Sequence, residues 1–137
     1  MPAIAAVTIN DGAATPVAHT FNPVNIVGDV AKLADRSGGI ALGYPVITQS
    51  IRAPGNGLRT YKVVQRVIVP TLEVTSPSTS TGIQPAPTLA YNLLCNLEWV
   101  LPERSSLQER KNLLAYVKNY LAHANTTVAV QDFDALY

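Results

Sequence analysis

Two short stretches of the chain place hydroxyl and cationic side chains at alternate positions. The first runs from Thr48 to Arg52 and the second from Tyr61 to Pro70. Because the side chains of a strand alternate between its two faces, every second residue of a stretch shares a face. One such face carries Thr48, Ser50, Arg52, Lys62, Val64, Arg66 and Ile68. Cations can neutralise phosphates and hydroxyls can hydrogen-bond to unpaired bases, so this face is a candidate nucleic-acid surface.

Charge alone leaves a second explanation open. No acidic residue lies between Asp35 and Glu73, whereas the same segment holds Arg36, Arg52, Arg59, Lys62 and Arg66. The whole chain has a net charge of +1, and 14% of its residues are charged. In a chain so poor in charge, such a cluster also arises by chance. From charge alone, the two interpretations therefore have equal weight.

The two stretches are expected to form an antiparallel hairpin, because residues 53–59 between them are rich in Pro, Gly and Asn. A third strand is expected at Leu89–Leu101. Its more polar face carries Asn92, Leu94 and Asn96 and should continue the candidate surface. Its other face is expected to belong to the core and carries Tyr91, Leu93, Cys95, Leu97, Trp99 and Leu101.

The N-terminal part of the chain is expected to supply further strands. Ala3–Asn10 and Thr15–Phe21 predict a hairpin, which Asn22–Pro23 should end. Val24–Leu33 fits either a short strand or a helical turn, and the strand is favoured. The segment from Thr75 to Thr88 is rich in Ser, Thr and Pro, which predicts a projecting, functional loop.

Toward the C-terminus the periodicity becomes helical. Ser106 and Glu109 fit a capping box, in which each side chain bonds to the backbone of the other residue. Apolar residues at helical spacing predict a helix from Leu107 to about His123, which Asn125–Thr127 should end. Val128–Leu136 is expected to form a short second helix.

These elements predict an α+β fold: an antiparallel sheet, made of an N-terminal hairpin and a larger meander, followed by two C-terminal helices. Residues 1–137 should form a single domain, with 1–101 mainly sheet and 102–137 a helical dimerisation segment. One open sheet and one long helix bury little apolar surface alone. We therefore expect a dimer in which the helices pack across a shared sheet.

Composition disfavours several classes of protein. The apolar content of 47% argues against a disordered chain. Cys95 is the single cysteine, so an internal disulfide is excluded. We expect neither a secretory signal nor a membrane span, and hence a protein made in the cytoplasm.

No pattern of catalytic or cofactor-binding residues is recognisable, so no enzyme, metal ion or cofactor is expected. His19 and His123 lie far apart and lack the spacing of metal ligands. Asp132 and Asp134 are spaced like a carboxylate pair but more simply solvate the end of the chain. The chain contains no nucleophile elbow, phosphate-binding loop or dinucleotide fingerprint.

The order of these features resembles the coat proteins of single-stranded RNA bacteriophages, the levivirus group. The resemblance rests on the Thr48, Ser50 and Arg52 alternation, the Tyr61–Pro70 strand, the Ser/Thr-rich loop, the capped helix after Pro102 and the tail ending in Tyr137. No single piece is specific to the family. The match lies in their order, their spacing and the total length of the chain.

The resemblance implies an intertwined dimer with a continuous sheet, in which the helices of each subunit cross over the sheet of its partner. It further implies that the protein is made in the bacterial host cytoplasm and that the dimers assemble into an icosahedral shell around the single-stranded genomic RNA of the virion. It also implies that the inner sheet face binds an RNA stem-loop at the replicase start, which represses translation and marks the genome for packaging. The RNA-binding residues it implies are Thr48, Ser50, Arg52, Lys62, Val64, Arg66, Asn92, Leu94 and Asn96.

Some positions depart from the family's pattern. Val64 and Leu94 stand where relatives carry polar or base-contacting residues, and sheet packing explains both more simply. Tyr91 lies on the opposite face from the tyrosine on which several relatives stack a base. The alternative function is a non-viral dimeric sheet protein that binds single-stranded nucleic acid. Such a protein would normally expose aromatic residues for stacking, and the candidate face has none.

Overall fold

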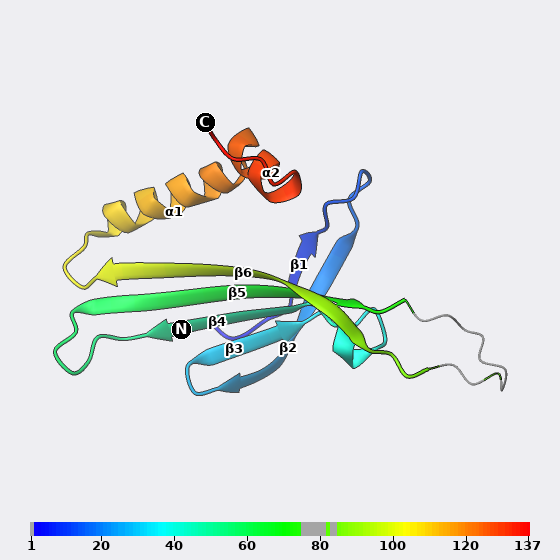
Figure 1. Cartoon of the computed structure of the whole chain (residues 1–137). Coiled ribbons are helices and arrows are strands. Elements are labelled where there is room, and N and C mark those ends of the chain that lie inside the picture. Colours follow the sequence, from blue (N-terminus) through cyan, green and yellow to red (C-terminus); the bar gives the residue numbers. More distant parts are fainter. Residues whose placement is uncertain (1, 75–81, 83–84) are drawn as a thin grey trace. The chain divides into compact units, whose positions relative to one another are not determined.

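The computed structural model describes residues 2–74, 82 and 85–137, and the chain divides into two compact units. The first unit ends at Val100 and contains the sheet, and the second begins at Leu101 and contains the helices (Figure 1). The predicted loop at 75–88 lies largely outside the described residues.

The first unit is built on a six-stranded sheet whose strands lie side by side in chain order (Figure 1). The strands are β1 (Val7–Asn10), β2 (Ala18–Val27), β3 (Val30–Ala34), β4 (Val46–Arg52), β5 (Thr60–Leu72) and β6 (Leu89–Pro102). The pairs from β1 to β5 are antiparallel. The sequence-based expectation of an antiparallel sheet followed by two helices is therefore confirmed.

Strand β2 does not end at Asn22–Pro23, and this prediction is wrong. Its residues from Ala18 to Phe21 pair with β1, and the strand then continues to Val27 while pairing with β3. The register shifts between Pro23 and Asn25. A proline, which lacks an N–H donor, is tolerated at such a bulge. Pro23 therefore bends β2 without ending it.

The segment predicted as one short strand at Val24–Leu33 is a hairpin. Val27 pairs with Val30, so Gly28 and Asp29 form a two-residue turn. Gly28 has a φ of 58°, a conformation that its lack of a Cβ permits. Beyond β3 lies the 3₁₀-helical turn Ala41–Gly43, which leads into β4.

The central hairpin of β4 and β5 forms as expected but is longer. The turn between the strands contains Asn56 and Gly57, with φ values of 51° and 81°. Strand β5 passes through Pro70 and ends at Leu72. Its pairing with β4 stops at Ile68, so Pro70 lies where no donor toward β4 is needed.

The second unit contains α1 (Leu107–Leu121) and α2 (Ala124–Gln131). The capping box is confirmed: Glu109 N–H donates to Ser106 Oγ at 3.2 Å, and Ser106 N–H donates to Glu109 Oε2 at 2.7 Å. The Ser106 N–H also holds the pKa of the Glu109 carboxyl below its ordinary value. The negative charge of Glu109 is thus favourable near the N-terminus of α1. Neither helix of the described chain is long and apolar enough to cross a membrane.

The expected boundary between the helices is wrong. Thr126 and Thr127, predicted to end α1, lie in the first turn of α2, and Thr126 Oγ1 donates to the Tyr120 carbonyl at 2.8 Å. The start of α2 is set by His123, whose Nδ1 accepts a hydrogen bond from the Asn125 N–H at 3.2 Å. The helix ends at Gln131, before Phe133 with its φ of 59°.

Very little apolar surface is buried within the described chain. The buried apolar side chains are Phe21, Leu33 and Ala34, with 6%, 8% and 3% of their surface exposed. Tyr91 and Leu93, which were expected in the core, are each 59% exposed. The described residues of the first unit therefore leave the Tyr91 and Leu93 part of this face of β6 exposed.

Candidate nucleic-acid interface

The register of β4 and β5 brings the first two rows of candidate residues together. Thr48 lies opposite Arg66, Ser50 opposite Val64, and Arg52 opposite Lys62. Residues directly opposite each other in an antiparallel pair share a face. The predicted sharing of one face is therefore confirmed, whereas the binding role of these residues stays a prediction. We call the surface formed by the even-numbered residues from 48 to 52, 62 to 66 and 92 to 98 the polar face.

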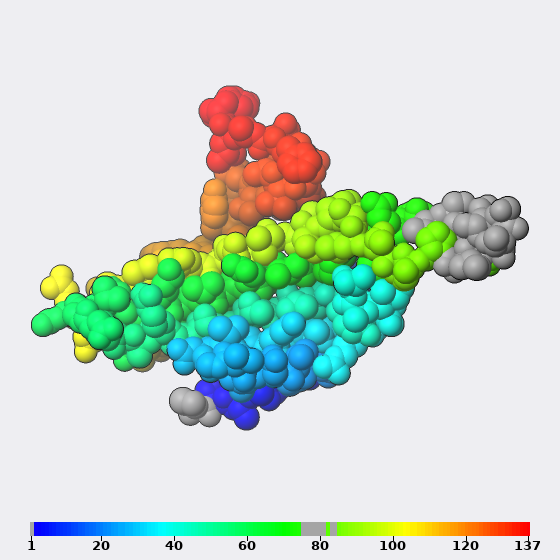
Figure 2. All heavy atoms as spheres, turned by 60° about the horizontal axis from the view of Figure 1, so that its bottom comes forward, coloured from blue at the N-terminus to red at the C-terminus, as the bar shows by residue number. Residues whose placement is uncertain are grey.

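Two side-chain contacts connect β6 to β5 on the polar face. Arg66 Nε donates to Asn96 Oδ1 at 2.7 Å, and Lys62 Nζ lies 2.8 Å from Glu98 Oε1. As the residue number rises along β5, the contacted residue on β6 falls, so β6 runs antiparallel to β5. By strand alternation Asn92 and Leu94 share the face of Asn96. Figure 2 shows the side chains of β2 to β6 side by side in one broad surface.

The two apolar members of the polar face differ in their surroundings. Val64 is half-buried beside Ser50, so packing within the sheet accounts for it. Leu94 is 56% exposed, so packing within the described chain does not account for it. Of these two residues, Leu94 is the more accessible to a ligand.

Glu98 is a member of the polar face that sequence reasoning did not nominate as a binding residue. Its carboxylate neutralises Lys62, whose side chain is 32% exposed while that of Glu98 is 52% exposed. Arg52 and Arg66 are exposed and form no ion pair within the described part of the chain. The positive charge of the face is thus concentrated on the two arginines.

Lys32 was also missed. It lies opposite Thr48 on β3, and Asn25 lies opposite Lys32 on β2, so both continue the polar face beyond β4. The two-residue Gly28–Asp29 turn was the signal that could have placed them, because it fixes the register of the hairpin.

The reverse face of the sheet carries a polar chain across three strands. Trp99 Nε1 donates to Gln65 Oε1 at 3.0 Å, and Gln65 Nε2 donates to Gln49 Oε1 at 3.2 Å. Trp99 and Gln65 are half-buried. Otherwise this face is apolar near its centre, where Leu33 pairs with Ile47. It is suited to packing, and the described residues of β3 to β6 on this face include no cation for phosphate.

Three titratable residues outside the polar face form an Asp–His–Asp cluster. His19 Nδ1 lies 2.8 Å from Asp35 Oδ2, and His19 Nε2 lies 3.3 Å from Asp11 Oδ2. The carboxylate of Asp35, and then that of Asp11, raise the pKa of His19 above its ordinary value.

The carboxylates of this cluster are themselves stabilised by the backbone. The N–H groups of Val17 and Ala13 hold the pKa of Asp11 below its ordinary value, and the N–H of Ser37 does the same for Asp35. The cluster ties the turn after β1 and the end of β3 to β2. No group of metal-ligating side chains is found among the described residues.

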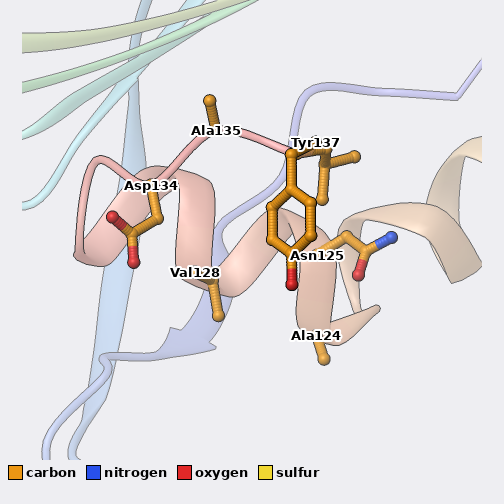
Figure 3. A pocket seen from close by; sticks show the side chains of 7 residues that line it. Ala124, Asn125, Val128, Asp134, Ala135 and Tyr137 are labelled. Atoms are coloured by element: carbon orange, nitrogen blue, oxygen red, sulfur yellow. The ribbon is translucent and has the colours of Figure 1, made fainter.

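The second unit has a hollow of about 440 Å³ between α2 and the C-terminal residues. It is lined by Ala124, Asn125, Val128, Asp134, Ala135, Leu136 and Tyr137 (Figure 3). Its lining holds one acidic side chain, that of Asp134, and no basic one, and Tyr137 and Leu136 are themselves exposed. We assign no chemistry to it.

Comparison with known proteins identifies one family that matches almost the whole chain. A family model described as the levivirus coat protein matches residues 2–137. The capsid protein of Pseudomonas phage PRR1 is 29% identical over 113 residues, which cover 82% of this chain and 81% of that protein.

Solved structures give the same result. The virus-like particle of bacteriophage ESE058 is 30% identical, with a TM-score of 0.90, over 99% of this chain and 100% of that chain. The virus-like particle of bacteriophage NT-214 is 28% identical, with a TM-score of 0.86, over 98% of each chain. The protein capsid of bacteriophage GA, at 18% identity and a TM-score of 0.75 over 97% of each chain, shares the fold. The chain therefore belongs to the levivirus coat protein family and is a structural, non-enzymatic capsid protein of a bacteriophage virion.

Proposed function

We propose that this capsid protein forms homodimers, that the dimers assemble into an icosahedral shell around single-stranded genomic RNA, and that the polar face binds an RNA stem-loop. Stem-loop binding would repress translation and select the genome for packaging. The observation that carries the RNA-binding part is the register of β4 and β5, which unites hydroxyls and cations on one face.

Dimerisation is supported by what the chain leaves exposed. A chain of 137 residues normally buries a large apolar core on folding, whereas Phe21, Leu33 and Ala34 are the apolar side chains buried within the described residues. In the second unit, Leu114 and Tyr116 of α1 are 57% and 69% exposed. A second copy of the chain supplies a partner for these surfaces. Residues 102–137 would then act as the helical dimerisation segment of a single coat-protein domain.

The edge of the sheet supports the same arrangement. Strand β6 is the last strand of the sheet and runs for 14 residues. No strand of the described residues pairs with its outer edge, which therefore presents backbone donors and acceptors that soluble proteins normally cover. Pairing with β6 of a second copy would give a continuous sheet and would place the two polar faces on one side. Assembly of such dimers into shells is supported by the solved relatives, which are described as virus-like particles.

The chemistry of the polar face fits RNA. Arg52 and Arg66 can neutralise phosphates without reading sequence, and Lys62 can do so once it leaves Glu98. The hydroxyls of Thr48 and Ser50 can hydrogen-bond to bases of a loop or bulge, where RNA is read most readily. Asn92 and Asn96 add amide donors and acceptors. Val64 and Leu94 would contribute apolar contact.

The proposal is tested first by the state of the purified protein. We expect it to sediment as large particles that carry RNA, and electron microscopy should reveal closed shells. Recovery as a small monomer free of nucleic acid would contradict the proposal.

The binding face is tested by Arg66→Ala. Loss of one phosphate contact should flatten the slope of log affinity against log salt by about 0.7–0.9 in a filter-binding titration. Arg104→Ala makes the same charge change at an exposed arginine that lies after β6 and outside the polar face, and it should leave the slope unchanged. An unchanged slope for Arg66→Ala would show that the RNA lies elsewhere.

A further inference from the structure

One row of polar side chains crosses five strands of the sheet. Strand pairing aligns Asn25 with Lys32, Lys32 with Thr48, and Thr48 with Arg66, and Arg66 is bonded to Asn96. Neighbouring strands lie about 4.8 Å apart, so the row extends about 14 Å from β6 to β3 and about 19 Å from β6 to β2. All nine nominated residues lie on β4, β5 and β6, and three of them, Thr48, Arg66 and Asn96, belong to the row.

The charge of Lys32 is not used within the described protein. Lys32 is exposed, and no described carboxylate lies within ion-pair distance of it. The neighbouring Asp35 carboxylate already binds His19 and the Ser37 N–H. Lys32 is therefore free to meet an external anion.

Protection of a sheet edge does not explain this lysine. Lysine is depleted in strands and is favoured mainly on edge strands, where it discourages pairing with other chains. Strand β3 is an interior strand, with β2 on one side and β4 on the other. Lys32 lies there in line with Thr48 and Arg66, so its presence is explained by a role other than the protection of an edge.

We propose that Lys32 is a phosphate-binding residue of the RNA surface and that, with the amide of Asn25 beside it, it extends this surface onto β3 and β2. The inference rests on the proposed RNA binding by the polar face. The ammonium group would neutralise a backbone phosphate of RNA that crosses the sheet along the row, beyond the phosphates bound by Arg66. Like other lysine–phosphate contacts, it would add affinity without base specificity.

The test compares Lys32→Ala and Lys32→Gln with the wild-type protein. The probe is a fluorescein-labelled single-stranded RNA of 20 nucleotides and mixed sequence, and binding is measured by fluorescence anisotropy in 50 to 200 mM salt. Both variants should flatten the salt slope by about 0.7–0.9, which narrows the affinity difference from the wild type by about threefold across this range. Lys32→Arg should restore the wild-type slope. Size-exclusion chromatography and circular dichroism verify that each variant keeps its fold.

The matched control is Lys111→Ala, which removes an exposed lysine from α1 and should leave the slope unchanged. If Arg66→Ala flattens the slope while folded Lys32→Gln does not, the inference about Lys32 is wrong and the proposed function stands. If neither variant flattens the slope, the polar face is not the RNA surface and both proposals fail. Equal flattening by Lys111→Ala would mean that the probe reports only net charge, which also overturns the inference.

Discussion

The ion pair between Lys62 and Glu98 makes a specific prediction about RNA affinity. Lys62 Nζ lies 2.8 Å from Glu98 Oε1, on the face proposed to meet phosphates. RNA that recruits Lys62 must compete with this carboxylate and must also approach its negative charge. Replacing Glu98 with Gln removes the charge while keeping the size of the side chain. Glu98→Gln should therefore bind RNA more tightly than the wild type.

The magnitude follows from the exposure of the pair. Side chains that are 32% and 52% exposed form a partly solvated pair, which is worth about 0–1 kcal/mol. Freeing Lys62 should accordingly raise RNA affinity by up to about fivefold at low salt. The face gains one positive charge, so the salt slope should steepen by up to about 0.9.

The assay is a salt-dependent anisotropy titration with the labelled RNA of 20 nucleotides. Glu103→Gln is the matched control, because it makes the same charge change at an exposed residue in the turn after β6. The control should leave both affinity and slope unchanged. Weaker binding by Glu98→Gln would refute the reasoning, since it would mean that the carboxylate accepts a hydrogen bond from the RNA and does not compete with it.

Two further predictions concern stability. Ser106→Ala removes the cap of α1 and should lower the free energy of unfolding by about 1 kcal/mol, measured by urea unfolding at fixed protein concentration. Ser106→Asn keeps a capping side chain and should retain most of this stability. Equal losses for the two variants would exclude the cap as the cause. His19 has a raised pKa, so its contribution is complete below its ordinary value of 6.5 and is lost as pH rises through the folded value. Asp11 and Asp35 have lowered pKa values, so their contribution to stability is complete above their ordinary value of 3.8 and is lost as pH falls through the folded value. The stability advantage of the wild type over His19→Gln should thus be greatest between about pH 4 and pH 6.5, and a difference independent of pH from 4 to 9 would contradict this.

Much of the polar face could be predicted from the sequence because strand alternation has a period of two. Once Thr48–Arg52 and Tyr61–Pro70 are recognised as strands, Thr48, Ser50 and Arg66 can only fall on the faces that alternation gives them. The capping box was equally local, because Ser106 and Glu109 need no distant partner. Membership of the levivirus coat protein family removes the alternative of a non-viral sheet protein.

The errors arose where a local signal has two meanings. A proline usually ends a strand, but at a bulge Pro23 bends β2, which continues into the hairpin that carries Lys32. Asn125–Thr127 resembles the end of a helix, yet His123 caps a new helix immediately before it. The Lys62–Glu98 pair depends on the register between β5 and β6, which no short turn fixes.

The hydrogen bonds from Trp99 to Gln65 and from Gln65 to Gln49 favour one register of the strands in the sheet. Gln49 lies directly opposite Gln65, so a slip of one residue would set Gln49 against Val64 or Arg66 and lose the bond between the glutamines. The same slip would turn side chains of one face toward the other. A coat protein must repeat one surface faithfully in every copy of its shell. In this chain, strands in the wrong register would lose hydrogen bonds on the reverse face. The correct register of the polar face is thus stabilised without any contact to RNA.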